Sequence, residues 1–233
     1  APVSLIVSAF APVTDVRRHL TPQLRRADEP TYLLLLDLGG GKNRLGGSCL
    51  AQVYGRVGGE TPDLDEPERL KNFFDAIQEL NQRGMLLAYH DRSDGGLLAT
   101  VAEMVMASRL GASLQLDGST QRVLEQLFAE EAGAVIQVAK NKLTQVQMIL
   151  DRTGARATAI GRVEAKPVLT VRNGDETILK LGRSQMQREW SATSYRMQEL
   201  RDNPAKAKEE VDRIVDDDNP VLNVELMFDP GDD

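Results

Sequence analysis

The sequence predicts an α+β fold, a mixed β-sheet covered by helices, over about residues 1–201. Strand-like and helix-like segments alternate along this part of the chain, which is typical of domains that pack helices against a sheet. Hydrophobic residues make up 41% of the chain and aromatic residues only 4%, so aliphatic side chains must fill the core. With 233 residues, the chain can form one large domain with appendages.

Runs of β-branched and aliphatic residues between turn residues predict the strands. The expected strands are Val3–Ala9, Tyr32–Asp37, Met85–Tyr89, Ala112–Leu116, Gly133–Ala139, Ala157–Val163, Val168–Arg172 and Thr177–Leu181. Asn173-Gly174 is a typical two-residue hairpin turn, so the last two strands are expected to pair with each other.

Apolar residues at three- and four-residue spacing predict the helices. The expected segments are Asp15–Leu24 (a helix or turn), a helix starting at Ser48, a helix within Pro62–Arg83, Leu97–Ser108, Arg122–Phe128, Lys142–Arg152 and Ser184–Arg201. The helix within Pro62–Arg83 is expected to be capped and closed by Gly84. Its buried face would consist of Leu70, Phe73, Phe74, Ile77 and Leu80.

The negative charge of the chain is concentrated near its C-terminus. Residues 209–233 contain ten Asp and Glu residues and one Arg, so the remaining residues carry about +2 of the total of −7. This distribution argues against nucleic acid as a partner. Residues 202–233 have the composition of an acidic linker, which we expect to lead toward an absent domain, although the apolar segment Val221–Phe228 could pack on a neighbour.

Cysteine content and hydropathy bear on the location of the protein. The single cysteine, Cys49, excludes an internal disulfide and fits the reducing cytoplasm. Apolar runs stay well below the length of about 18 residues that a transmembrane helix needs, so no membrane association is expected. A strand-like segment beginning near residue 3 suggests a chain cut from a longer one.

The most informative segment is His90-Asp91-Arg92-Ser93-Asp94-Gly95-Gly96, between an expected strand and an expected helix. A carboxylate that leaves the end of a strand can ligate Mg²⁺, and Asp91 is the candidate. Ser93 could bond a phosphate oxygen. Ser93 or Asp94 could also cap the following helix, while the two glycines would let backbone N–H groups approach an anion.

Spacing alone does not decide between this site and a simpler structure. Ser93 and Asp94 could be only a helix cap, and the glycines only a tight turn. The order of His90, Asp91, Ser93, Asp94 and two glycines resembles the signature of the superfamily that contains aminoimidazole ribonucleotide synthetase and selenophosphate synthetase.

Further blocks in the same order give a finer resemblance, to the second synthetase half of the large, single-chain phosphoribosylformylglycinamidine synthases. The blocks are Leu45–Tyr54, Leu87–Leu97, Gly133–Val138 and Trp190–Pro204. The resemblance supports the α+β fold of the C-terminal domain of such a synthetase. The blocks around Leu45 and Trp190 argue against other superfamily members, such as a small-molecule kinase or selenophosphate synthetase.

The resemblance implies an ATP- and Mg²⁺-dependent ligase of purine biosynthesis. Such an enzyme converts formylglycinamide ribonucleotide to its amidine with ammonia from glutamine. It implies that Asp91 is a magnesium ligand and that Ser93 contacts the nucleotide, ATP or ADP, with no catalytic residue assigned in this chain. Upstream synthetase and downstream glutaminase domains would be intramolecular partners, and the isolated chain would be inactive. An alternative is a structural scaffold whose nucleotide never turns over.

Other residues have weaker claims to a function. The loop Gly39–Ser48 nearly matches a Walker A sequence but has Gly47 where the phosphate-binding lysine should stand. It could still be a substrate or phosphate loop with Lys42 and Arg44 as free cations, or only a flexible connection. His90 is expected to orient its neighbour rather than to catalyse, and Cys49 to be a small core residue. Glu130 and Glu131 are expected to be helix-end charges near the site.

Overall fold

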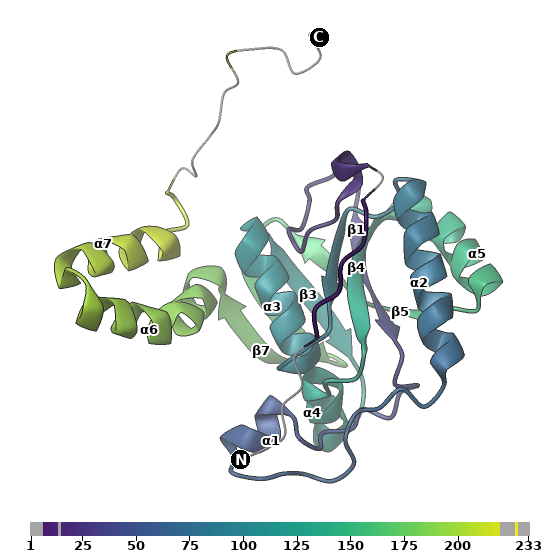
Figure 1. Cartoon of the computed structure of the whole chain (residues 1–233), viewed down its shortest axis with the longest axis horizontal. Helices are drawn as coiled ribbons and strands as arrows, with labels where there is room; N and C mark the ends of the chain where they lie inside the picture. Colours follow the sequence, from purple (N-terminus) through teal and green to yellow (C-terminus); the bar gives the residue numbers. More distant parts are fainter. Residues whose placement is uncertain (1–6, 14, 220–226, 228–233) are drawn as a thin grey trace.

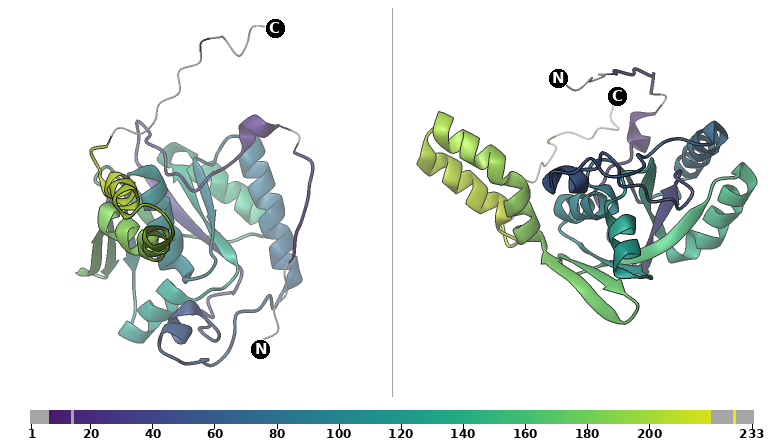
Figure 2. Two further views of the ribbon diagram at one scale, coloured as in Figure 1. Left: turned by 60° about the vertical axis from the view of Figure 1, so that its left-hand side comes forward. Right: turned by 90° about the horizontal axis from the view of Figure 1, so that it is seen from below.

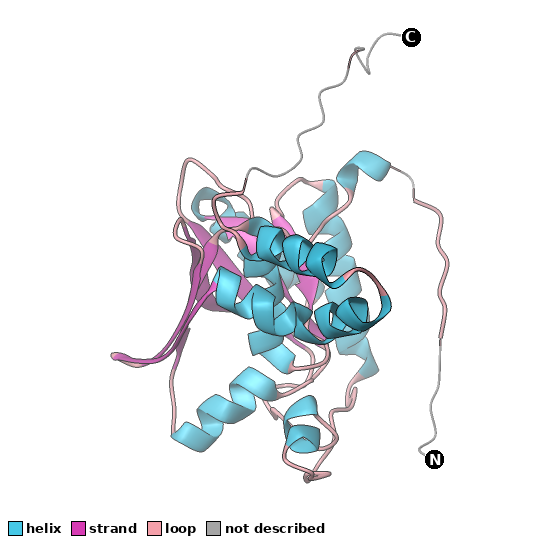
Figure 3. Ribbon diagram, turned by 90° about the vertical axis from the view of Figure 1, so that its left-hand side faces the viewer, coloured by secondary structure: helices cyan, strands magenta, loops and turns pink. Residues whose placement is uncertain are grey.

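The protein is described by a computed structural model that covers residues 7–13, 15–219 and 227. Its centre is a seven-stranded sheet. In spatial order its strands are β2 (Ala88–Asp91), β4 (Gly133–Ala139), β1 (Thr31–Asp37), β5 (Ala157–Glu164), β3 (Gly111–Leu116), β6 (Val168–Asn173) and β7 (Glu176–Gly182). β3 and β6 pair in parallel, and the other neighbours in the sheet pair antiparallel. Helices lie on both sides of the sheet (Figure 3). The α+β class and the mixed sheet that the sequence predicts are confirmed.

The helices are α1 (Cys49–Val53), α2 (Pro67–Gln82), α3 (Gly96–Ser108), α4 (Thr120–Phe128), α5 (Leu143–Thr153), α6 (Arg183–Arg201) and α7 (Pro204–Val215). Short 3-10 helices are η1 (Val16–Arg18) and η2 (Lys140–Lys142).

Two apolar clusters lie on opposite faces of the sheet. α2 and α5 pack on one face, and α3 and α4 on the other (Figure 1). β1 contributes to both because successive side chains of a strand alternate between faces. Leu33 packs in the cluster with α3 and α4, whereas Leu34 and Leu36 pack in the cluster with α2 and α5. The clusters are almost entirely aliphatic, as the composition predicts.

Most predicted strands are confirmed within one or two residues, but two are not. Residues 7–9, the described part of the expected strand Val3–Ala9, form no strand. β2 begins three residues later than expected and runs through His90 to Asp91, because its pairing with β4 starts at Ala88 and ends at Asp91. His90 and Asp91 therefore belong to the strand rather than to the turn.

The buried face of α2 is narrower than the sequence predicts. Ala76, Ile77 and Leu80 are buried, whereas Leu70 and Phe74 are exposed, because only one stripe of the helix meets the sheet and α5. Glu66, the residue that precedes the helix, makes no capping hydrogen bond through its side chain, so the expected N-terminal cap is absent. Within the described residues, no helix has the length and apolar character needed to cross a membrane.

The prediction that the pattern dissolves after Asp202 is wrong for residues 204–215, which form α7. Asn203 caps this helix by accepting hydrogen bonds from Ala205 N and Lys206 N, and Pro204 occupies its first position. α7 runs back along α6, and the pair lies beside the sheet next to the β6–β7 hairpin (Figure 2). The boundary near residue 201 stays a prediction, and Val221–Phe228 lies outside the described residues apart from Met227.

Candidate functional site

The signature loop, defined here as residues 91–96, joins the end of β2 to the start of α3. Asp91 is exposed, and the Tyr89 hydroxyl donates a hydrogen bond of 2.7 Å to its Oδ1. Burial, and then the neighbouring Asp91 carboxylate, raises the pKa of Tyr89 well above its usual range, so this hydroxyl remains a donor at neutral pH. The Asp91 carboxylate is thus oriented by Tyr89 and accessible to a metal ion.

Ser93 and Asp94 are exposed and do not cap α3. The N-cap residue is Gly95, whose φ of 80° is left-handed, and it makes no capping bond through a side chain. The predicted cap by Ser93 or Asp94 is therefore wrong, because the left-handed turn at Gly95 separates both side chains from the first turn of the helix. The Ser93 side chain is open to solvent, and the exposed Asp94 carboxylate lies near Cys49 and Glu130.

The backbone N–H group expected to meet an anion is already used by a carboxylate of the protein. Glu130 Oε1 accepts hydrogen bonds of 2.8 Å from Gly95 N and of 2.8 Å from Cys49 N. Gly96 N donates to Ser93 O within the loop. The expectation that the glycine N–H groups bind phosphate is thus wrong for this structure, since Glu130 neutralises the positive ends of α1 and α3.

Close packing explains the glycines instead. A Cβ atom on Gly96 would lie 2.7 Å from the carbonyl carbon of Phe128, and one on Gly39 would lie 2.5 Å from Cδ of Glu131. Gly96 also has a left-handed φ of 67°, which disfavours any residue with a side chain. The segment 128–131 therefore touches two glycine-containing loops so closely that neither loop has room for a side chain at these positions.

The glycine-rich loop, defined here as residues 39–48, holds no free cation of the kind that the sequence suggests. Arg44 is buried and its Nε donates to Glu131 Oε1 at 2.7 Å, while Asp65 lies 3.1 Å from Arg44 Nη2. Hydrogen bonding to Glu131 raises the pKa of the Arg44 guanidinium above its usual range. Lys42 Nζ pairs with Asp65 at 3.1 Å. Both cations neutralise carboxylates of the protein, which corrects the prediction.

The buried Arg92 and the half-buried Asp37 form an ion pair that sequence reasoning missed. Arg92 donates to Asp37 Oδ1, and its Nε donates to Glu131 O at 2.6 Å. Asp37 also accepts a hydrogen bond of 2.6 Å from Gly41 N. The sequence signal was that Asp37 ends the aliphatic strand β1 and that Arg92 directly follows β2. The pair attaches the signature loop to the end of β1.

His90 does not orient Asp91, which corrects the expectation for this residue. Strand alternation places it on the opposite face from Tyr89 and Asp91, where its Nε2 lies 2.6 Å from Glu103 Oε2 of α3. His90 and Glu103 line a mostly apolar cavity of about 360 Å³ together with Met106 and Trp190. Trp190 therefore lies near His90 of β2, on the face of the strand opposite Asp91.

Cys49 is half-buried at the start of α1 and belongs to neither apolar cluster, so the prediction of a core residue is wrong. Burial raises the pKa of its thiol, and the carboxylates of Glu130 and Asp94 raise it further. Ligand atoms of Cys49, Asp94 and Glu130 lie within 4.8 Å of one another. Because Mg²⁺ prefers oxygen ligands throughout, this group is not the magnesium site predicted at Asp91.

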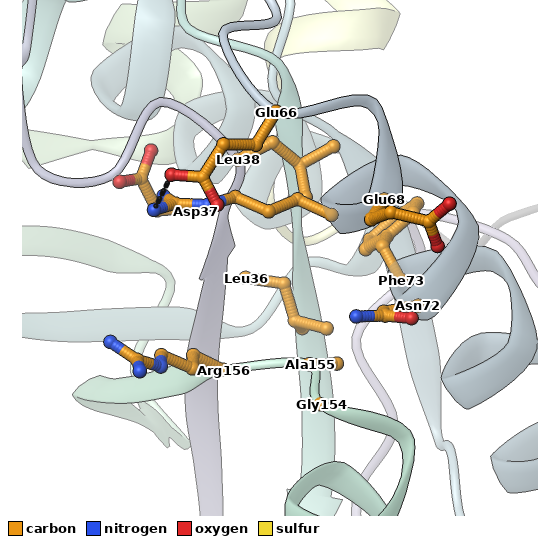
Figure 4. A pocket seen from close by; sticks show the side chains of 11 residues that line it. Leu36, Asp37, Leu38, Glu66, Glu68, Asn72, Phe73, Gly154, Ala155 and Arg156 are labelled. Carbon is orange, nitrogen blue, oxygen red and sulfur yellow. Dashed lines mark hydrogen bonds and ion pairs between the residues drawn. The ribbon is translucent and has the colours of Figure 1, made fainter.

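Two hollows flank the end of β1. A wide one of about 790 Å³ lies toward α4 and is lined by Asp37, Asn43, Arg122 and others. A smaller one of about 160 Å³ lies between α2 and the end of α5, with Asn72 and Phe73 on one side and Arg156 turned away (Figure 4). Arg69 in the smaller hollow is paired with Glu66, so its charge is already balanced.

Together, the fold and these loops define an α+β domain in which a strand–turn–helix segment presents a carboxylate and a hydroxyl to solvent. Residues 33–173 match the family model described as AIR synthase related protein, C-terminal domain. The chain belongs to this family. The match covers the sheet from β1 to β6 and includes the signature loop, the glycine-rich loop and segment 128–131.

Solved structures of Thermotoga maritima proteins share the fold. Phosphoribosylformylglycinamidine synthase II is 15% identical, with a TM-score of 0.58, covering 73% of this chain and 28% of that chain. PurL complexed with ATP is 16% identical, with a TM-score of 0.55, covering 70% and 27%. PurL complexed with FGAR is 15% identical, with a TM-score of 0.57, covering 73% and 30%. The chain thus spans less than a third of these proteins.

Proposed function

We propose that this chain is the C-terminal domain of the second synthetase half of a cytoplasmic phosphoribosylformylglycinamidine synthase, and that it forms one wall of a nucleotide site. The whole enzyme would use ATP, Mg²⁺ and glutamine-derived ammonia to convert formylglycinamide ribonucleotide to its amidine. ATP would phosphorylate the amide oxygen, and ammonia would then displace the phosphate as the new C–N bond forms. Upstream synthetase and downstream glutaminase domains would complete the enzyme.

The observation that carries the proposal is the exposed Asp91 carboxylate at the end of β2, oriented by Tyr89 and followed by the exposed Ser93. Mg²⁺ usually binds one or two carboxylates together with phosphate oxygens and water. In the proposed site Asp91 ligates the ion and Ser93 donates to a phosphate oxygen. Phosphoryl transfer depends mainly on such orientation and charge stabilisation. Family membership and the likeness of the fold to PurL support this assignment.

A second function for the same site is structural, with a nucleotide that is held and never hydrolysed. One observation favours this alternative. Gly95 N–H donates to Glu130, so one fewer backbone donor is left for a transferring phosphoryl group. In either case the chain supplies only part of the coordination shell. We therefore expect the isolated chain to bind Mg²⁺ and ATP weakly.

Asp91→Asn in the intact enzyme tests the proposal. Asparagine keeps an oxygen that can accept from Tyr89 but loses the charge that binds the metal. We expect the affinity for Mg²⁺–nucleotide to fall by about tenfold or more, and Ser93→Ala to weaken it by a smaller factor. Calorimetric titration with ADP and Mg²⁺ measures the affinity, and the nucleotide released by acid measures occupancy.

Asp75→Asn is the matched control, since Asp75 is an exposed carboxylate on α2 that lies outside both the signature loop and the glycine-rich loop. If the Asp91→Asn enzyme folds but no longer turns over its substrate, the nucleotide at this site is catalytic. If the variant loses its bound nucleotide and its solubility, while the enzyme that stays soluble keeps its turnover, the nucleotide is structural. Unchanged affinity and turnover in Asp91→Asn would contradict the proposal.

A further inference from the structure

Segment 128–131, between α4 and β4, connects the two loops described above. Glu130 Oε1 accepts from Gly95 N of the signature loop and from Cys49 N, the residue directly after the glycine-rich loop. Each hydrogen bond is 2.8 Å long, and each joins a carboxylate to the start of a helix. Charge-assisted bonds of this kind are about twice as strong as bonds between neutral groups.

Glu131 connects the same two loops independently. Its side chain is fully buried and accepts from Arg44 N at 3.0 Å and from Arg44 Nε at 2.7 Å. Its backbone oxygen accepts from Arg92 Nε at 2.6 Å. Glu131 therefore contacts both loops, and Glu130 contacts the signature loop and the residue directly after the glycine-rich loop. The tight approach at Gly39 and Gly96 leaves little room for either loop to shift.

We propose that Glu130 is a positioning residue whose carboxylate holds the signature loop and the glycine-rich loop in one fixed arrangement, and so sets the geometry of the nucleotide site without touching the ligand. The expected effect of Glu130 on nucleotide binding rests on the proposed function. Its structural part, that Glu130 joins the two loops, can be tested without any nucleotide.

Glu130 is the better residue to change than Glu131. Glu131 neutralises the buried Arg44, so removing its carboxylate leaves an unpaired buried charge and endangers folding. Glu130 is only half-buried and binds backbone N–H groups rather than a buried cation. Glu130→Ala removes both hydrogen bonds. Glu130→Gln keeps an oxygen that can accept both and removes only the charge, so it serves as the conservative variant.

The chain offers a matched control in Glu29. Its Oε2 accepts a hydrogen bond of 2.9 Å from Asn141 N, at the start of the segment that leads into α5. Glu29→Ala therefore also removes a bond between a carboxylate and a backbone N–H group, but in a part of the chain that contacts neither loop. A general loss of stability would affect the two alanine variants alike, whereas a positioning role would separate them.

Amide hydrogen exchange of this chain, followed in peptides that contain Cys49 and Gly95, is the first measurement. We expect both peptides to exchange about tenfold faster in Glu130→Ala, as the loss of a charge-assisted hydrogen bond implies. In Glu130→Gln, which keeps the bonds without the charge, the increase should be within about threefold, and Glu29→Ala should exchange near the wild-type rate. Unchanged exchange at both peptides in Glu130→Ala would overturn the inference. Equal acceleration of both by Glu29→Ala would overturn it as well.

Affinity of the intact enzyme for ADP and Mg²⁺ is the second measurement. We expect Glu130→Ala to weaken binding about tenfold and Glu130→Gln to restore it to within about threefold of wild type. If exchange rises in Glu130→Ala while affinity stays at the wild-type value, the positioning role is refuted. A different result would contradict the proposed function itself, namely an Asp91→Asn enzyme that binds nucleotide like wild type.

Discussion

At the scale of single residues, the site is made by carboxylates with different tasks. Asp91 is exposed and oriented by Tyr89, so it is free to bind a ligand. Glu130 and Glu131, adjacent in the chain, bind the protein instead. The sequence pointed to Asp91 as a candidate ligand through the resemblance of its signature, because spacing alone left a simple capped turn open. It could not predict the task of Glu130, because the partners of this carboxylate lie 35 and 81 residues away.

Cys49 provides a residue-scale test of this arrangement through its pH dependence. Burial and the carboxylates of Glu130 and Asp94 raise the pKa of the thiol, so the folded protein disfavours the thiolate. Alkylation by iodoacetamide should therefore rise at a higher pH in the folded chain than in the urea-unfolded chain. The stability that the neutral thiol contributes is present below the unfolded pKa and is lost as the pH rises toward the folded value.

Glu130→Gln removes one of the charges that disfavour the Cys49 thiolate. The alkylation profile of the folded variant should shift to lower pH but stay above that of the unfolded chain, because burial is the larger cause. A profile that coincides in wild type and variant would show that Glu130 does not lie beside the thiol.

At the scale of elements, the contact between the start of α3 and the end of α4 depends on Gly96. Gly96→Ala would combine a left-handed φ of 67° with a Cβ only 2.7 Å from the carbonyl carbon of Phe128. We expect the free energy of unfolding to fall by about 2–5 kcal/mol, the sum of the usual costs of backbone strain and overpacking. Urea unfolding measures this change.

Gly174→Ala is the control for Gly96→Ala. Gly174 also has a left-handed φ, of 57°, but a Cβ there would meet open space in the β6–β7 turn. It should cost only about 1–2 kcal/mol, the strain alone. Equal losses in the two variants would mean that segment 128–131 does not pack against the signature loop as described.

Elements also mark the limit of prediction from sequence. β1 and β4 could be predicted because buried strands read as continuous aliphatic runs. α7 was missed because a charged amphipathic helix, Pro204–Val215, has the composition of a linker and buries little more than Ala207 and Val215. The cap of α3 was misread because Ser93 and Asp94 have the residue types of a cap, whereas the left-handed Gly95 takes that position.

At the scale of the whole molecule, the sheet brings segments that are distant in the sequence together at one end of its strands. β1 and β4 pair along their length, so Asp37 lies opposite Gly133, and β2 pairs with the other side of β4. Both loops and segment 128–131 therefore meet where β1 and β2 end and β4 begins. The proposed nucleotide site lies at this meeting point, and its other wall is expected from a domain outside this chain.

The most direct test of the central claim is a structure of the intact enzyme with Mg²⁺ and ADP bound. The account predicts the ion at about 2.1 Å from a carboxylate oxygen of Asp91, with the Ser93 hydroxyl bonded to a phosphate oxygen and Glu130 still bound to Gly95 N. A nucleotide-bound ion that is coordinated elsewhere, while Asp91 keeps only its hydrogen bond from Tyr89, would contradict it.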